Sequence, residues 1–266
     1  MKSNEALKIV DLHVEVAGKK VLKGVNFSVK AGEVHALFGP NGSGKTTLIS
    51  AIMGFQGFNV TKGDILFDGK SILALTVDER AKLGLGLSFQ RPPVVRGVSL
   101  KKLSQLCAKT DGARLEQYSR DLNMEEFLER EVNVGFSGGE IKRAELLQLL
   151  LQDPTFVFLD EPESGVDLEN IVLLGNAINH LLGRKREPDS KKPLMKFHHS
   201  RKSGLIITHT GHILEYVEAD VGCVLVDGKI ICSGNPREIL HTIRKCGYHE
   251  CYRCFGDKKI EDLNSA

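Results

Sequence analysis

Residues 39–46 read Gly39-Pro40-Asn41-Gly42-Ser43-Gly44-Lys45-Thr46. This stretch matches every fixed position of the motif G-x-x-x-x-G-K-[ST]. Gly42 and Gly44 let successive backbone N–H groups turn towards phosphate oxygens, and Lys45 adds a positive charge at the β- and γ-phosphates. The Thr46 hydroxyl is a suitable Mg²⁺ ligand. The stretch therefore predicts a phosphate-binding loop for a nucleoside triphosphate and Mg²⁺.

The residues on either side of this loop have the patterns of a strand and a helix. A short apolar run over 34–38 precedes the loop, and residues 45–53 have a helical pattern. The N-terminus of a helix attracts anions through its dipole and its free N–H groups. Thr47, in the first turn of this predicted helix, therefore joins residues 39–46 among the expected nucleotide contacts.

The composition is that of a globular chain with a substantial core. The chain has 266 residues, of which 41% are hydrophobic, which suggests one large domain with an inserted subdomain. No stretch approaches the roughly 18 apolar residues needed to cross a membrane, and residues 1–5 lack the apolar core of a signal peptide. We therefore expect a cytoplasmic protein without direct membrane insertion, in which the six cysteines stay reduced.

The positive charge of the chain is concentrated in one segment. Residues 184–203 contain eight Lys or Arg and two acidic residues, whereas the whole chain has a net charge of only +2. Prolines and the absence of apolar periodicity predict a long loop between a helix and a strand. This basic loop is compatible with a solvated insertion or with a docking surface for an acidic partner. Nucleic acid is not the partner that we expect.

Apolar patterns in the first half of the chain predict two substructures. Alternating apolar residues over 10–16 and 25–29 predict two antiparallel edge strands, and an Asp68-Gly69 turn predicts a hairpin. Residues 99–130 have a helical pattern. We therefore expect an N-terminal antiparallel β subdomain, followed by an inserted helical subdomain at about residues 91–150.

The second half of the chain alternates between helices and strands. The patterns predict a helix over 140–151, a buried strand over 156–159, a helix from Leu168 and a strand over 205–208. This alternation favours an α/β fold with a mainly parallel core sheet. A terminal helix follows a second hairpin. We assign residues 1–245 to one domain and residues 246–266 to a cysteine-containing tail.

Two carboxylates follow the predicted strand over residues 156–159. Ligands collect at the C-terminal ends of the strands in a parallel sheet, so Asp160 and Glu161 would lie near the phosphate loop. Asp160 is suited to bind Mg²⁺ or its water, together with Thr46. Glu161 is suited to orient and polarise the attacking water. An Asp-Glu pair after an apolar run is common, and the phosphate loop is what makes this pair informative.

A second predicted anion cradle precedes the helix over residues 140–151. The sequence here is Phe136-Ser137-Gly138-Gly139-Glu140. Ser137 is a suitable N-cap, and the two glycines expose backbone N–H groups to an anion. One nucleotide rarely needs two such cradles from one chain. We therefore expect this cradle to bind the nucleotide of a second subunit in a two-fold dimer.

Taken in order, these motifs resemble those of the ATP-binding-cassette ATPases over about residues 7–241. The matching segments are the phosphate loop, Gln90, Ser137-Gly138-Gly139, Asp160-Glu161, Ser164-Gly165-Val166-Asp167 and His209. The resemblance implies ATP hydrolysis with Glu161, His209, Gln90 and Lys45 as catalytic residues. It implies nucleotide contacts from Ser137, Gly138, Gly139 and Glu140, and Mg²⁺ ligands at Thr46, Gln90 and Asp160.

Within that family, the segment around residues 136–148 is most similar to SufC, the ATPase of iron–sulfur cluster assembly. The similarity rests on Glu140 in place of the usual Gln, and on Lys142-Arg143 and Glu145-Leu146-Leu147-Gln148. It implies a soluble partner, a SufB- or SufD-like scaffold, and ATP-driven contact between two ATPase subunits. The basic loop is longer than the corresponding SufC connection.

Two other functions use the same phosphate loop. The nucleotide-binding subunit of a membrane transporter has identical hydrolytic residues, so the catalytic motifs do not separate it from an assembly ATPase. A P-loop kinase is the third possibility, but the second cradle at Ser137 has no role in a kinase.

Three cysteines near the end of the chain have the spacing of a metal site. Cys246, Cys251 and Cys254 follow C-x₄-C-x₂-C, the spacing of the first three ligands of a plant-type iron–sulfur cluster. His249 and Cys232 are candidates for the fourth ligand. Zinc bound by three cysteines and a histidine is one alternative, and cysteines that only pack in the core are the other.

Overall fold

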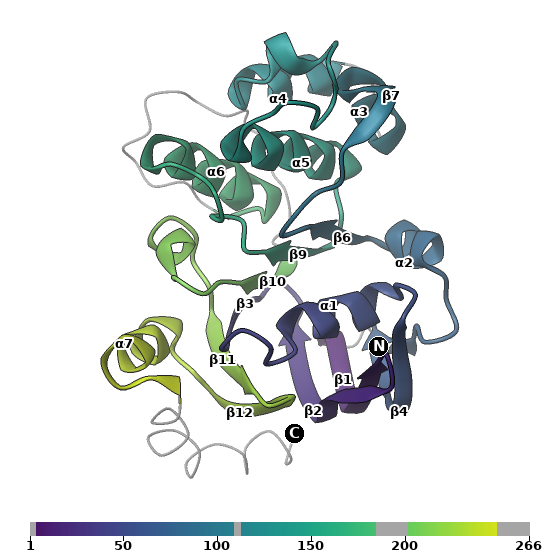
Figure 1. The fold of residues 1–266 in the computed structure, drawn as a ribbon, viewed down its shortest axis with the longest axis vertical. Coiled ribbons are helices and arrows are strands. Elements are labelled where there is room, and N and C mark those ends of the chain that lie inside the picture. The colour runs from purple at the N-terminus through teal and green to yellow at the C-terminus, as the bar shows by residue number, and fades with distance from the viewer. Residues whose placement is uncertain (1–3, 109–112, 185–201, 249–266) are drawn as a thin grey trace.

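The computed structural model describes residues 4–108, 113–184 and 202–248 of the chain. Two sheets and their helices form stacked layers, with the helical segment at one end and the N-terminal sheet at the other (Figure 1). Among the described residues, no helix is long and apolar enough to cross a membrane.

A six-stranded sheet forms the centre of the molecule. Its order is β12 (Lys229–Gly234), β11 (Val221–Val226), β3 (Val34–Phe38), β10 (Ser203–Ile207), β9 (Phe156–Asp160) and β6 (Leu85–Ser88). All neighbouring strands are parallel except β12, which is antiparallel to β11. Every residue of β3, β9 and β10 is buried, as expected for parallel strands covered on both faces. The predicted mainly parallel core sheet is confirmed.

A second, antiparallel sheet contains the N-terminal strands. Its order is β2 (Lys19–Lys30), β1 (Glu5–Val16), β4 (Phe58–Phe67) and β5 (Lys70–Ser71). The sequence prediction of two edge strands was wrong for β1, because β4 pairs with its other side. Alternation of apolar residues reports which faces of a strand are buried and carries no information about its neighbours.

Helix α1 (Lys45–Met53) lies between the two sheets (Figure 1). Its buried apolar side chains, which include Leu48, Ile49 and Ile52, join a core cluster with residues from both sheets. Helix α2 (Val77–Leu83) leads from the antiparallel sheet into β6. The two layers therefore hold α1, and the loop that precedes it, in a fixed position.

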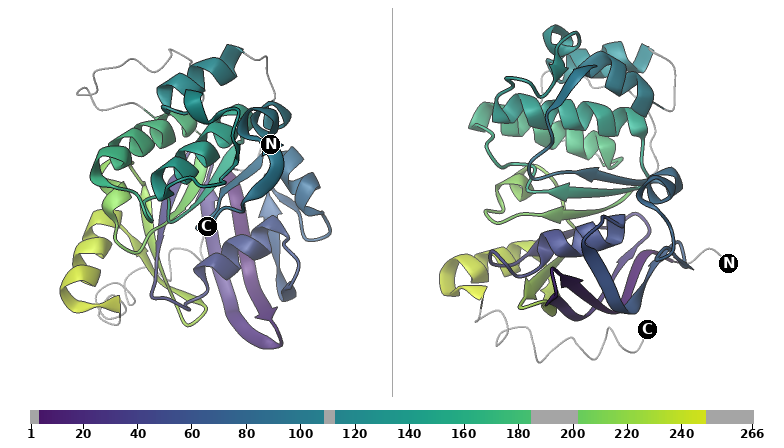
Figure 2. Two further views of the ribbon diagram at one scale, coloured as in Figure 1. Left: turned by 45° about the horizontal axis from the view of Figure 1, so that its top comes forward. Right: turned by 45° about the vertical axis from the view of Figure 1, so that its right-hand side comes forward.

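Two long helices cover the other face of the central sheet. They are α5 (Gly138–Gln152) and α6 (Leu168–Leu181), and both contribute to a second core cluster with β9 and β10 (Figure 2). Ser137 caps α5, as predicted, by accepting a hydrogen bond from the Glu140 backbone N–H. Helix α7 (Pro236–Cys246) follows β12 and packs on β11.

The helical segment is more divided than the sequence predicted. It contains α3 (Leu100–Cys107), α4 (Ala113–Asp121) and a short 3₁₀ helix, η1 (Glu125–Phe127). The sequence prediction missed the pairing of β7 (Val95–Ser99) with β8 (Glu131–Val132) around them. A strand of two residues has too few alternating positions to be recognised. The boundaries assigned to the domain and the tail stay predictions.

Candidate functional site

The phosphate loop connects β3 to α1, the strand–loop–helix context that its motif requires. Gly42 and Gly44 have φ angles of +79° and +109°, which L side chains rarely adopt. At Gly39, a Cβ atom would lie 2.3 Å from the backbone oxygen of Leu225 in β11. Glycine is therefore required at these positions, for two different reasons.

Lys45 extends back over this loop. Its Nζ donates hydrogen bonds to the backbone oxygens of Gly39 at 2.8 Å and Pro40 at 3.0 Å. Lys45 is only 5% exposed, and burial lowers the pKa of its ammonium group, while Glu161 and Asp160 oppose this shift. A buried ammonium group with little water around it is stabilised when an anionic ligand such as a phosphate binds beside it.

Asp160 and Thr46 lie next to each other. Asp160 ends β9, and its Oδ2 accepts a hydrogen bond from the Thr46 hydroxyl at 3.3 Å. Its other oxygen, Oδ1, is buried without a hydrogen-bond partner among the described residues. Burial and the neighbouring Glu161 charge both raise the pKa of Asp160. A buried carboxylate oxygen without a partner, beside a hydroxyl, fits a divalent cation with oxygen ligands.

Glu161 has an unusual backbone conformation. Its φ angle is +49°, in the left-handed region, where a residue other than glycine typically costs about 1–3 kcal/mol. Its N–H donates a hydrogen bond to the backbone oxygen of Ile207 in β10, at 3.0 Å, which helps to hold this conformation. Such strain is often found at active sites.

Two predicted catalytic side chains contact the Glu161 carboxylate, one at each oxygen. Gln90 Nε2 donates a hydrogen bond to Oε2 at 2.7 Å, and His209 Nε2 lies 2.5 Å from Oε1. Gln90 follows β6 and His209 follows β10, so the two contacts come from opposite sides of β9 in the sheet order. The structure therefore brings together three residues that lie far apart in the sequence.

The loop that carries His209 is held by two residues that sequence reasoning did not identify. Glu163 accepts hydrogen bonds from the hydroxyls of Thr208 and Thr210. Arg244 of α7 donates a hydrogen bond to the Thr210 backbone oxygen at 2.8 Å. Glu163 lies 45 residues before Thr208, and Arg244 lies 34 residues after Thr210. No local sequence pattern connects residues that are so far apart.

The second predicted cradle, residues 137–140, lies at the start of α5. The Glu140 carboxylate accepts a hydrogen bond from the Ser137 backbone N–H at 2.7 Å, which completes a capping box. A Cβ atom on Gly138 would lie 2.4 Å from the Gly165 backbone oxygen, so the cradle packs against the loop over 164–167. Within the described part of the chain, no hydrogen bond or ion pair joins residues 137–140 to residues 39–46.

The predicted cysteine site lies mostly outside the described residues. Cys246 is exposed at the end of α7, and Gly247 after it has a φ angle of +76°. Cys251, Cys254 and His249 lie outside the described ranges, as do residues 185–201 of the basic loop. Among the residues that the structure does describe, no three His, Cys, Asp or Glu side chains are grouped so that they could hold a metal ion. The cysteine site stays a prediction.

Several known proteins are similar to this chain in sequence. The profile of the ABC transporter family matches residues 22–164, more than half of the chain. A probable ABC transporter ATP-binding protein of Streptococcus pyogenes serotype M18 is 40% identical over 91% of this chain and 93% of its own length. Vegetative protein 296 of Bacillus subtilis is 39% identical over 91% of each chain. The probable ATP-dependent transporter ycf16 of Pyropia yezoensis is 37% identical over 92% of this chain and 97% of its own length.

Solved structures share the fold. An ATP-binding cassette of an ABC transporter in its ADP conformation has a TM-score of 0.69 and 23% identity, and the match covers 98% of this chain and 99% of that one. A bacterial Atm1-family ABC exporter with ATP bound has a TM-score of 0.73 and 18% identity, with 95% of this chain and 42% of that chain covered. The chain therefore belongs to the ABC transporter family of ATP-binding proteins and is an ATP-hydrolysing cassette.

Proposed function

We propose that this chain hydrolyses ATP with Glu161 as the residue that activates the attacking water. The observation that carries the proposal is the contact of both Glu161 oxygens with Gln90 and His209, directly after the buried Asp160. A carboxylate fixed at both oxygens is held in one orientation and loses little conformational entropy during the reaction. Gln90 and His209 therefore act by orienting Glu161 and by donating hydrogen bonds to groups that approach it.

The phosphate loop supplies the binding half of this site. Residues 39–47 would surround the β- and γ-phosphates, with backbone N–H groups and the Lys45 ammonium as donors. Thr46 and Asp160 would hold Mg²⁺, with Gln90 beside them, because Asp160 Oδ1 has no other partner among the described residues. When bound, Mg²⁺ neutralises the charge that develops on the phosphate oxygens.

A complete site would require two copies of the chain. Residues 137–139 form an N-terminal helix cradle that no hydrogen bond connects to the phosphate loop within the described ranges. The N–H groups of such a cradle attract phosphate. A two-fold dimer would place this cradle of one subunit over the nucleotide of the other, with the loop over 164–167 at the contact.

The cellular role that we propose is cluster assembly. The chain would be the ATPase of a soluble, cytoplasmic SufBC(D)-type iron–sulfur assembly complex, in which ATP-driven dimerisation remodels a SufB- or SufD-like scaffold. Support comes from Glu140, Lys142 and Glu145, the features of residues 136–148 that resemble SufC. Glu140 completes the capping box of α5.

The nucleotide-binding subunit of a membrane transporter is the second candidate. It is favoured by the names of the relatives, which include a probable ABC transporter ATP-binding protein and a probable ATP-dependent transporter. The hydrolytic residues would be the same in both cases, so the partner distinguishes the two functions.

Affinity purification of the Glu161→Gln variant with ATP from the source cell distinguishes these partners. We expect a partner that stays in the supernatant after membranes are sedimented without detergent, and that mass spectrometry identifies as a SufB- or SufD-like scaffold. The Lys45→Ala variant is the matched control, because it should not form the ATP-dependent contact. A membrane-embedded permease that co-purifies only in detergent would overturn the assembly role and leave the ATPase activity standing.

A further inference from the structure

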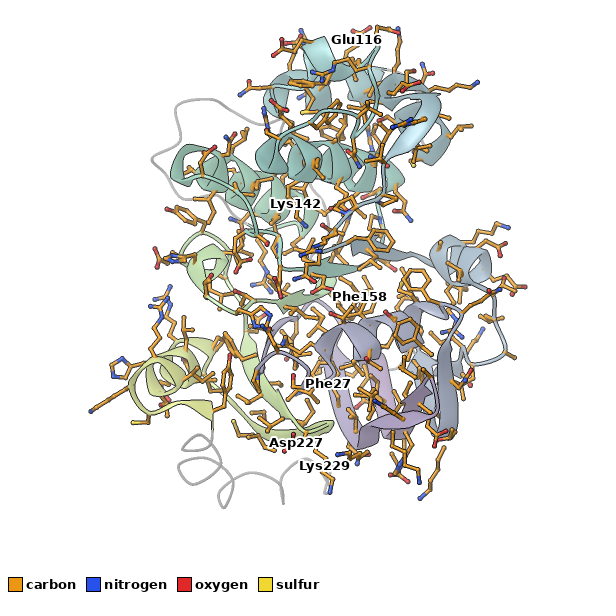
Figure 3. The ribbon with its side chains drawn as sticks, viewed as in Figure 1. Phe27, Glu116, Lys142, Phe158, Asp227 and Lys229 are labelled. Atoms are coloured by element: carbon orange, nitrogen blue, oxygen red, sulfur yellow. The ribbon has the colours of Figure 1, made fainter. Side chains whose placement is uncertain are left out.

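Two charged residues of α5 are buried next to the segment that carries Gln90. Lys142 is 3% exposed and Glu145 is 8% exposed, although Lys and Glu are rarely buried unless they are paired. Both lie on the side of α5 that faces the central sheet, where Figure 3 labels Lys142. Their partners explain how the charges are tolerated.

Glu145 binds the end of β6 through both carboxylate oxygens. Oε2 accepts a hydrogen bond from the Ser88 hydroxyl at 2.7 Å, and Oε1 accepts one from the Phe89 backbone N–H at 2.7 Å. Lys142 Nζ donates a hydrogen bond to the Phe89 backbone oxygen at 2.5 Å and lies 3.8 Å from Glu145 Oε2. The N–H and the C=O of Phe89 are therefore both bound by α5.

Gln90 is the next residue along the chain. Because a peptide unit is planar, fixing the N–H and C=O of Phe89 strongly restricts where the Gln90 backbone can lie. The Gln90 side chain then reaches Glu161 Oε2 at 2.7 Å. An unbroken series of contacts thus leads from α5, through Phe89 and Gln90, to the carboxylate that we propose activates water.

The same helix begins at Ser137, the N-cap of the second cradle. We propose that Lys142 and Glu145 are positioning residues: by binding the Phe89 backbone, they hold Gln90 in contact with Glu161 from the same helix that carries the Ser137 cradle. This inference rests on the proposed role of Glu161 and adds a specific physical connection to it.

The network is well suited to this task because breaking it is costly. Hydrogen bonds to a buried charged group contribute more to the stability of the fold than hydrogen bonds between neutral groups. Removing the partner of a buried charge lowers that stability strongly. Burial also raises the pKa of Glu145, while Lys142 and the hydrogen bonds from Ser88 and Phe89 lower it. If Phe89 left α5, Lys142 and Glu145 would both lose a hydrogen bond while remaining buried.

A double-mutant cycle between Glu145→Ala and Gln90→Ala tests the inference. In the wild-type background, Glu145→Ala should lower kcat about tenfold, because a small misplacement of a catalytic group has effects of this size. The Kd for ATP should change less than about twofold, because no contact of the phosphate loop is removed. In the Gln90→Ala background, Glu145→Ala should lower kcat less than about twofold.

Gln148→Ala is the matched control. It shortens a polar side chain of the same helix, and that side chain donates its hydrogen bond to Ala144, within α5. Gln148→Ala should leave kcat unchanged. Glu145→Gln keeps an acceptor for the Phe89 N–H, so its kcat should be close to that of the wild type. If Glu145→Ala does not fold, Ser88→Ala removes one bond to the carboxylate and enters the same cycle.

Equal losses from Glu145→Ala in both backgrounds would overturn the inference, as would no loss in the wild type. The proposed function has a separate criterion. If Gln90→Ala alone leaves kcat unchanged, the assignment of Gln90 to the site fails. If Gln90→Ala lowers kcat and the cycle is additive, only the connection through Glu145 fails.

Discussion

Replacement of Glu161 by Gln should lower the rate of ATP hydrolysis by about 10²- to 10⁴-fold, the usual effect of losing a positioned general base. The amide keeps the size of the side chain, so Gln90 and His209 keep a neighbour of the same shape. It also removes a negative charge that would repel the γ-phosphate. ATP should therefore stay bound, and a dimer should accumulate in light scattering after size-exclusion chromatography with ATP.

Glu215→Gln is a suitable control for this variant. Glu215 is an exposed carboxylate, and within the residues that the structure describes the only basic side chain within 4 Å of it is His212, at 3.8 Å. Its replacement should leave hydrolysis and oligomeric state unchanged. Hydrolysis by Glu161→Gln at the wild-type rate would show that another group activates the water.

Replacement of Lys45 by Ala should weaken ATP binding by about 100-fold or more, because charge-assisted hydrogen bonds to phosphate are among the strongest contacts in such a site. The fold should be retained, because among the described residues Lys45 donates only to the Gly39 and Pro40 oxygens of its own loop, and its removal eliminates a buried charge. Isothermal titration calorimetry with ATP measures the loss, and circular dichroism checks the fold.

Lys82→Ala serves as the control for Lys45→Ala. Lys82 is an exposed lysine paired with Asp78 on the surface of α2, and such pairs contribute little to stability. It should bind ATP with the wild-type Kd. An unchanged Kd in Lys45→Ala would contradict the assignment of the phosphate loop.

The sequence predicted those parts of the fold that depend on local signals. The phosphate loop, the buried strand β9 and the Ser137 cap are each defined by a few consecutive residues, and the structure has all three. The sequence also predicts that Asp160, at the end of one strand, and Thr46, shortly after another strand of the same parallel sheet, lie close together, and the structure has this contact.

Contacts between distant segments could not be predicted in the same way. The Glu145–Phe89 hydrogen bond joins residues that are 56 positions apart, and β1 acquires its second neighbour, β4, from a separate segment. In the sequence, Lys142 and Glu145 are only features of a resemblance. A charged residue in an apolar part of a helix is a signal of a buried pair, but it does not name the partner.

The most direct test of the central claim, that two copies of this chain share each ATP, mixes two inactive variants. Lys45→Ala lacks the phosphate-binding half of the site, and Ser137→Arg blocks the cradle offered to the other subunit. Each homodimer should be inactive, whereas a mixed dimer contains one intact site. Hydrolysis should return to about a quarter of the wild-type rate per chain when half of the dimers are mixed and the sites act independently. A mixed dimer confirmed by native mass spectrometry that hydrolyses no more ATP than either variant alone would contradict the account.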